Sequence, residues 1–135
     1  MKTIVGLGEA LWDMLPQGKQ IGGAPINFAY HAAQTGHEAY AISALGQDTL
    51  GQEFANQLQQ KGMKLIMPLT AYPTGTVKVT LDAKGIPQYN ICQQVAWDYI
   101  PFTTEMEEIA RRTTAVCFGS LAQRNARSRN TMYRF

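Results

Sequence analysis

An α/β fold, in which helices cover both faces of a mostly parallel sheet, is the architecture that the sequence predicts. Strand-like apolar segments at 3–7, 40–45 and 63–67 alternate with helix-like segments at 25–35 and 49–61. Short alternation of this kind requires parallel strands joined by right-handed crossovers through the helices. We therefore expect a three-layer α/β/α sheet, with ligands binding at the carboxyl ends of its strands.

The first helix is predicted from its start and stop signals. Pro25 suits the first helical position, because the N–H that proline lacks has no partner there. Gly36 is placed to end the helix in the left-handed conformation. Small side chains at Ala29, Ala32 and Ala33 would let this helix lie close to the sheet.

The second helix has equally clear signals. Thr49 with Gln52 fits a capping box, and Gly62 supplies a stop after Lys61. One apolar side chain recurs every four residues along it, at Leu50, Phe54 and Leu58. This spacing predicts a helix over 49–61, followed by a strand.

A β-hairpin interrupts the alternation. Residues 76–81 alternate in the manner of a strand, 82–85 form a turn, and 86–92 return as a second strand. Pro87 lies in the returning strand and cannot donate a ladder hydrogen bond, which favours an edge strand or a bulge.

The α/β pattern then restarts. Thr104 with Glu107 predicts another helix start, and an apolar strand follows at 115–121. Residues 128–135 look like the first turns of a further helix, which would lead to more strands. We therefore expect the 135 residues to be the N-terminal part of a single larger domain.

Composition excludes several classes of protein. Hydrophobic residues make up 45% and charged residues 16% of the chain, and its net charge is +2, which is too small to indicate nucleic acid or anionic membrane as a partner. No apolar run approaches the roughly 20 residues of a membrane span, and no export signal is present. The two cysteines, Cys92 and Cys117, suit buried thiols in a reducing compartment. We expect a cytoplasmic protein.

The turn before the first helix is the most informative stretch. Gly22 and Gly23 let the backbone bend sharply and let a ligand approach main-chain N–H groups. Asn27 lies in the first helical turn, beside free amides and the positive end of the helix dipole. The turn fits a polar, neutral or anionic ligand. The alternative is an ordinary loop in which Asn27 only helps to cap the helix.

A longer pattern gives this turn a family context. The glycine pair, Asn27, the helix that closes at Gly36 and a further glycine at Gly46 resemble the first signature of the ribokinase-like, or phosphofructokinase B, family of sugar kinases. In that family this turn binds the sugar. Residues 8–13 are similar to the start of the fructokinase branch, where an aspartate at the position of Asp13 binds sugar hydroxyls. A carboxylate can accept hydrogen bonds from two vicinal hydroxyls; the alternative for this residue is a solvated turn aspartate.

The resemblance implies a ribokinase-like sheet with a small β lid, truncated at the C-terminus. The lid strands are expected around 10–20 and 75–100, where the predicted hairpin falls. Such a lid covers the sugar and excludes water, so that phosphoryl transfer goes to the sugar alcohol. The resemblance also implies a homodimer that forms through the lid.

Further site residues follow from the resemblance. Asp98 matches an aspartate of the family, whereas Trp97 stands where the family usually has a small residue. Tyr89 and Trp97 would either stack on the apolar face of a sugar or serve as core or interface residues. Gln93 and Gln94 stand near the position at which branches with acidic sugars carry arginine, which favours a neutral sugar.

Residues 118–124 are again similar to fructokinases and place a strand end beside the sugar. Gln123 would either reach the ligand or have a structural role. His31 and His37 lack further metal-ligand residues nearby, so we assign no metal site.

A dinucleotide-binding protein is a weaker interpretation. Gly6 and Gly8 follow a strand, but the third glycine of that fingerprint would stand at Leu11, and no acidic residue follows a second strand at the expected distance.

The resemblance implies ATP-dependent phosphorylation of a sugar hydroxymethyl group, with fructose the favoured substrate and Mg²⁺ neutralising the nucleotide. In the family, the anion hole and the general base come from a second signature beyond the position of Phe135. We therefore assign no catalytic residue here and expect the 135-residue chain alone to be inactive. The alternative is a non-enzymatic sugar-binding or dimerisation module.

Overall fold

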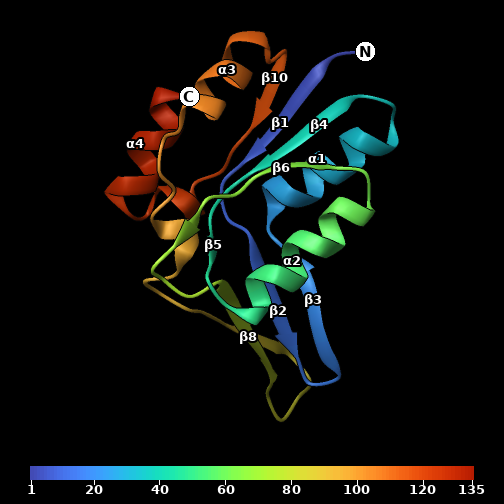
Figure 1. Ribbon diagram of the computed structural model, residues 1–135. Helices are drawn as coiled ribbons and strands as arrows, with labels where there is room; N and C mark the ends of the chain where they lie inside the picture. Colours follow the sequence, from blue (N-terminus) through green and yellow to red (C-terminus); the bar gives the residue numbers. More distant parts are fainter.

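The computed structural model describes all 135 residues (Figure 1). Its helices are α1 (Ala24–Gln34), α2 (Thr49–Gln60), α3 (Thr104–Arg112) and α4 (Ala126–Arg134), with short 3₁₀ turns η1 (Ala96–Asp98) and η2 (Leu121–Gln123). Its strands are β1 (Thr3–Leu7), β2 (Leu11–Leu15), β3 (Gly18–Gly22), β4 (Glu38–Ile42), β5 (Leu45–Gly46), β6 (Lys64–Ile66), β7 (Leu69–Thr70), β8 (Gly75–Leu81), β9 (Pro87–Ile91) and β10 (Ala115–Cys117).

The main sheet is parallel and has the strand order β10-β1-β4-β6. Its two faces are covered by different helices (Figure 1). On one face, Ala41 packs with Ile26 of α1 and Phe54 of α2. On the other face, Val5 packs with Met106 of α3 and with side chains of α4. Two cores on opposite faces make three layers, which confirms the predicted fold class.

A second, smaller sheet has the order β3-β2-β8-β9. Its hairpins β2–β3 and β8–β9 are antiparallel, and β2 pairs in parallel with β8 between them. It extends from the end of the main sheet at which β1 and β4 finish (Figure 1). The predicted hairpin is therefore confirmed, and Pro87 begins the edge strand β9.

Element boundaries differ from the predictions where a cap decides them. Asp48, not Thr49, is the N-cap of α2, because its carboxylate accepts from the Gly51 N–H. For the same reason Thr103 is the N-cap of α3. Gly36 has a φ of 87°, so the predicted left-handed end of α1 is confirmed.

Two predicted strands are shorter than expected. The segment predicted over 40–45 divides, because β4 ends at Ile42 and β5 pairs with β7 in a separate ladder. The strand predicted over 115–121 ends at Cys117. β10 lies at the outer edge of the main sheet, and Val116 and Phe118 there are 39% and 55% exposed.

Candidate functional site

Asp13 and Gly22 lie together on one face of the small sheet. Asp13 pairs across the ladders with Gln20 of β3 and Val77 of β8, so it lies on a central strand. A Cβ atom added at Gly22 would be 2.5 Å from Oδ2 of Asp13. The missing side chain therefore makes room for the carboxylate. Burial raises the pKa of Asp13 above its ordinary value.

Asp13 lines a pocket of about 300 Å³ on this face. Tyr89, whose side chain is largely exposed, lines the same pocket from β9. The pocket combines one carboxylate, the carboxamides of Gln17 and Gln20, an aromatic ring and aliphatic walls. These groups suit a small polyhydroxylated molecule that has an apolar face. The structure thus places two predicted site residues, Asp13 and Tyr89, in one pocket, and a third, Gly22, beside the Asp13 carboxylate.

Gly23 forms the turn from the small sheet into α1. Its φ is 110°, and a Cβ atom there would collide with the carbonyl oxygen of Glu9. Gly23 is also the N-cap of α1, so no side chain caps this helix, and no acidic residue lies in its first turn. No acidic side chain of α1 therefore accepts from its first N–H groups or balances the positive end of its dipole.

Glu9 is a residue that the sequence interpretation did not single out. Its side chain is 5% exposed, and Oε2 has no hydrogen-bond partner. Burial raises the pKa of Glu9, although the backbone N–H groups of Glu9 and Ala24 offset part of the rise. Burial, followed by the charge of Glu9, also raises the pKa of the Cys117 thiol.

Glu9 lies two residues after the end of β1, and Cys117 ends the neighbouring strand β10. In the main sheet, β4, the next strand along the chain, is the neighbour of β1 on one side, and β10, the last strand, is its neighbour on the other side. This is a topological switch point, the place at which open α/β sheets bind ligands. A glutamate two residues after the end of the first strand was the sequence signal that could have identified it.

Asn27 faces a different pocket from Asp13. Its side chain is exposed and lines a pocket of about 410 Å³ between β3, α1 and α2, together with Lys19 and Lys61. Gln20 lines both this pocket and that of Asp13. The structure therefore places Asn27 next to the Asp13 pocket without bringing it inside.

Asp98 is the buried partner of an ion pair with the half-buried Arg124. It is 2% exposed and accepts from Nε and Nη2 of Arg124 at 2.8 and 2.9 Å. Arg124 also donates to the carbonyl oxygen of Cys92 at 2.7 Å. The pair fixes the chain after β9 against the segment that contains η2.

Trp97 occupies the core. It is 1% exposed, the Arg124 guanidinium lies 4.1 Å from its ring centroid, and a Cβ atom at Gly75 would collide with its ring. This leaves the indole no free face for a sugar. Trp97 therefore lies where a core residue would, which was the second of its two interpretations.

Gln93 and Gln94 line a polar pocket of about 310 Å³ together with Asp98 and Arg124. Gln94 has a φ of 54° and is the one residue other than glycine with a positive φ. A non-glycine residue in this conformation is strained unless its surroundings hold it, and such strain is common at ligand sites.

The side chain of Gln123 is used inside the protein. Its Nε2 donates to the carbonyl oxygen of Gly119, and its Oε1 accepts from the hydroxyl of Tyr133, both at 3.0 Å. Both ends of the Gln123 side chain are thus hydrogen-bonded within the protein, which favours a structural role.

Gly6 and Gly8 are explained by helix packing. A Cβ atom at Gly6 would collide with the Pro25 carbonyl oxygen, and one at Gly8 would be 2.9 Å from the Pro25 ring. These glycines let α1 lie directly on β1, so a dinucleotide is not needed to account for them.

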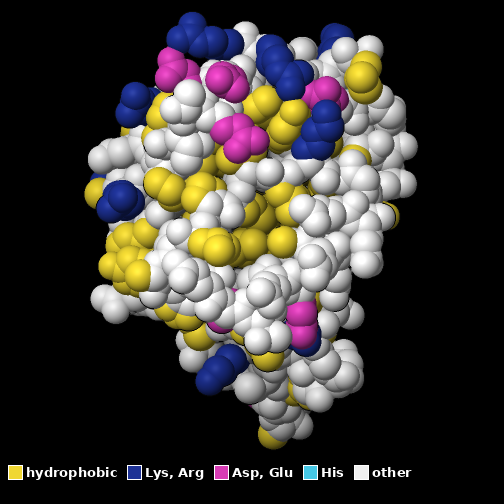
Figure 2. All heavy atoms as spheres, in the orientation of Figure 1, with side chains coloured by type: hydrophobic (Ala, Val, Ile, Leu, Met, Phe, Trp, Pro, Cys, Tyr) yellow, Lys and Arg dark blue, Asp and Glu magenta, His cyan; other side chains and the backbone are white.

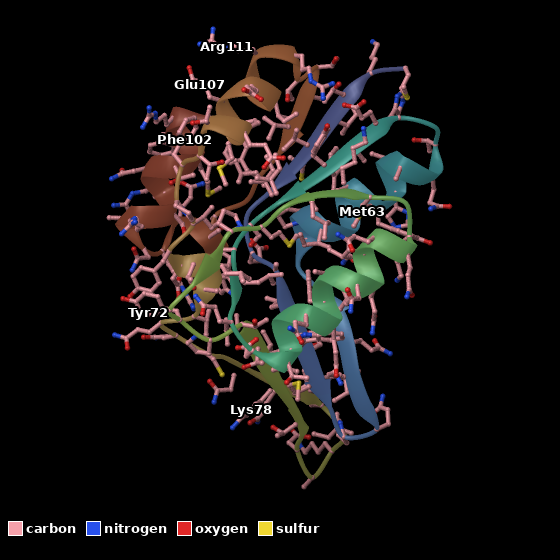
Figure 3. All side chains as sticks on the ribbon, in the orientation of Figure 1. Met63, Tyr72, Lys78, Phe102, Glu107 and Arg111 are labelled. Atoms are coloured by element: carbon pink, nitrogen blue, oxygen red, sulfur yellow. The ribbon has the colours of Figure 1, made fainter.

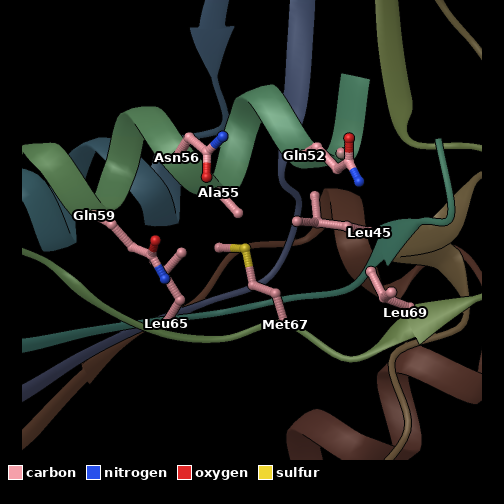
Figure 4. A pocket seen from close by; sticks show the side chains of 9 residues that line it. Leu45, Gln52, Ala55, Asn56, Gln59, Leu65, Met67 and Leu69 are labelled. Atoms are coloured by element: carbon pink, nitrogen blue, oxygen red, sulfur yellow. The ribbon is translucent and has the colours of Figure 1, made fainter. Parts of the chain in front are cut away.

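A pocket of about 600 Å³ between α2, β6 and β7 contains none of the predicted site residues. Hydrophobic side chains gather in this part of the surface (Figure 2), and Leu65, Met67 and Leu69 face α2 across the pocket (Figure 4). Its polar groups are carboxamides.

No group of three or more His, Cys, Asp or Glu side chains is arranged to hold a metal ion. None of the helices has both the length and the apolar character that crossing a membrane would require.

A parallel sheet between two layers of helices, which carries a small sheet at its strand ends, defines a three-layer α/β protein. Its Asp13 pocket has the groups that suit a small polar molecule. The chain belongs to the pfkB family of carbohydrate kinases, whose model matches residues 16–129. No curated protein sequence matches the chain.

Solved structures show the same fold. An uncharacterized sugar kinase from Pyrococcus horikoshii matches with a TM-score of 0.86 and 24% identity, over 98% of this chain and 48% of the other. That protein has also been solved in complex with ATP. Fructokinase from Vibrio cholerae O395 matches with a TM-score of 0.80 and 22% identity, over 99% of this chain and 48% of the other.

Fructokinase from Halothermothrix orenii matches with a TM-score of 0.82 and 20% identity, over 99% of this chain and 51% of the other. The chain therefore spans about half the length of the sugar kinases that it resembles.

Proposed function

We propose that this chain supplies the sugar-binding part of an ATP-dependent carbohydrate kinase, and that fructose is its substrate. The observation that carries the proposal is the Asp13 carboxylate, which lies over Gly22 in a pocket shared with Tyr89. A partly desolvated carboxylate on a central strand is a strong, directional acceptor for two neighbouring hydroxyls. The fructokinases among the structural neighbours support the choice of sugar, at identities that establish the fold alone.

We assign the sugar contacts to Asp13, the backbone of Gly22 and Gly23, Asn27 and Tyr89. Asn27 lines the neighbouring pocket, which has Gln20 in common with the Asp13 pocket, and would contact the sugar from that side. The role of Asp98 and Trp97 is to hold the segment after β9 in place, through Arg124 and the core. The role of Gln123 is to hold η2 against Gly119 and Tyr133 of α4.

The small sheet is, in this proposal, the lid over the sugar and the contact between two protomers. Its face beside Asp13 carries exposed apolar side chains that would be buried in a dimer: Leu81, Tyr89 and Ile91. Exposed apolar groups on a sheet of this size favour a partner surface. We place the protein in the cytoplasm.

ATP and Mg²⁺ belong to the proposal as what the family implies. The residues of this chain do not fit the metal, because no carboxylate cluster is available for it. We therefore derive no step through Mg²⁺, and we expect the 135-residue chain alone to bind sugar without transferring phosphate.

Isothermal titration calorimetry of the chain with fructose tests the proposal. We expect saturable binding, and Asp13→Asn should weaken it by at least about tenfold, since the charge on the acceptor is lost. Glu108→Gln is the matched control, because Glu108 is exposed on α3. Equal affinity of the wild type and Asp13→Asn would contradict the assignment of the site.

A non-enzymatic sugar-binding or dimerisation module is the second candidate. The exposed apolar side chains of the small sheet, Leu81, Tyr89 and Ile91, are the observation that favours it, because a dimerisation module needs such a surface. A protein that extends beyond Phe135 and phosphorylates fructose in a coupled kinase assay would favour the kinase instead.

A further inference from the structure

The small sheet is connected to the rest of the chain, the body, by four crossings. Three of them contain a residue in the left-handed region: Gly8 between β1 and β2, Gly23 between β3 and α1, and Gln94 between β9 and η1. The crossing from β7 to β8, residues 71–74, contains none. It is held in a different way, by side chains.

Asp48 and Thr74 hold this crossing to the body. The carboxylate of Asp48 accepts from the Thr74 backbone N–H at 2.9 Å and from the Thr74 hydroxyl at 2.6 Å. The Thr74 hydroxyl in turn accepts from the Gly46 N–H at 2.9 Å. Thr74 is 2% exposed, so these bonds are shielded from water. They connect β5, the start of α2 and the start of β8.

Glycines make room for this cluster of hydrogen bonds. A Cβ atom at Gly46 would be 2.6 Å from Oδ2 of Asp48, and one at Gly51 would be 2.9 Å from Oγ1 of Thr74. Burial alone would raise the pKa of Asp48, but the hydrogen bonds from Thr74 and Gly51 hold it below its ordinary value.

Two further contacts secure the same crossing. The carbonyl oxygen of Pro73 accepts from the Ala96 N–H at 2.7 Å. The ring of Tyr72 stacks on Tyr99 with 3.7 Å between centroids, and Figure 3 shows Tyr72 where the chain passes from the body to the small sheet. The crossing is therefore held by Asp48 on one side and by Ala96 and Tyr99 on the other.

The crossing leads directly to the strand beside Asp13. In the parallel ladder, Gly75 lies opposite Leu11 and Val77 lies opposite Asp13. Thr74 thus sets the position of β8 along β2, and a shift of β8 would change the wall of the pocket that contains Asp13.

We propose that Asp48 and Thr74 are positioning residues: they hold the start of β8 against the body and so keep the Asp13 pocket in the geometry that binds sugar. This inference rests on the proposed function.

Thr74→Val tests the inference, because it keeps the shape of the side chain and removes both hydroxyl hydrogen bonds. Amide hydrogen exchange should accelerate by about tenfold or more in β8, while β6 exchanges as in the wild type. The fructose dissociation constant should rise by a similar factor. Thr74→Ser, which keeps the hydroxyl, should restore both quantities.

Thr131→Val is the matched control. It makes the same atomic change at a buried threonine of α4, whose hydroxyl donates to the Ile100 carbonyl oxygen at 2.6 Å. We expect it to lower global stability without a selective effect on β8 or on fructose affinity. If Thr74→Val does not fold, Asp48→Asn replaces it, because asparagine still caps α2 but loses one acceptor for Thr74.

The inference is overturned if Thr74→Val, or its replacement, exchanges in β8 and binds fructose as Thr131→Val does. Faster exchange with unchanged affinity also overturns it, since the cluster would then be only structural. Failure of the wild type to bind fructose refutes the proposed function instead. The hydrogen-exchange data alone then decide whether Thr74 holds the start of β8 against the body.

Discussion

Replacing Glu9 with glutamine should stabilise the protein at alkaline pH. The side chain is 5% exposed, and one carboxylate oxygen has no hydrogen-bond partner. The ionised group is therefore desolvated with only partial compensation from the backbone N–H groups of Glu9 and Ala24, whereas glutamine has a similar shape and no charge. Leaving a buried polar group unsatisfied costs about 1–3 kcal/mol. We expect Glu9→Gln to raise the free energy of unfolding at pH 8 by about 1 kcal/mol, and Tm by about 3–5 °C.

The pH dependence gives the sign of the effect. Because the pKa of Glu9 is raised in the folded state, the folded protein binds the proton more tightly than the unfolded chain does. Its favourable contribution is present below the ordinary value of 4.5 and is lost as the pH rises through the raised pKa. The stability of Glu9→Gln relative to the wild type should therefore increase from about pH 4.5 upward and then level off.

Urea unfolding at a series of pH values from 4 to about 8 measures this difference directly. Glu108→Gln is the control, because Glu108 is exposed and carries the same charge. A difference between Glu9→Gln and the wild type that does not change with pH would refute the reasoning, as would a loss of stability at pH 8.

Three further predictions concern stability and are measured by urea or thermal unfolding. Arg124→Met should destabilise the protein by about 3 kcal/mol, because it leaves the Asp98 carboxylate buried without its partner; a loss below about 1 kcal/mol would contradict this. Gly75→Ala should cost about 1–3 kcal/mol and quench or shift Trp97 fluorescence, since the new methyl group meets the indole ring. Gly36→Ala should cost about 1 kcal/mol through backbone strain alone, because its φ is 87° and the space around it is open; no loss would contradict this.

The sequence predicted the architecture because its signals are local. The alternation of strands and helices, the stop at Gly36 and the turn between β8 and β9 each depend on a few neighbouring residues. Caps were less certain, because Asp48 and Thr49 are both good capping residues. The structure decides for Asp48, whose carboxylate also bonds Thr74, 26 residues away.

The candidate site was only partly predictable, for reasons of tertiary packing. Asp13 and Tyr89 share a pocket because β2 and β9 both flank β8, which no local pattern specifies. The surroundings of Glu9 include groups distant in sequence, namely the Ala24 backbone N–H and the Cys117 thiol. The ring of Trp97 is enclosed by Gly75 and Arg124, which are distant in sequence, so no local motif predicts this contact.

The outer edge of β10 has a practical consequence for anyone handling this chain. Its backbone N–H and C=O groups on that side have no strand to pair with, and Val116 and Phe118 are apolar and open to solvent beside them. An unprotected edge of this kind recruits strands from other molecules. Concentrated solutions of the 135-residue chain should therefore self-associate along this edge, and Val116→Lys should reduce this self-association.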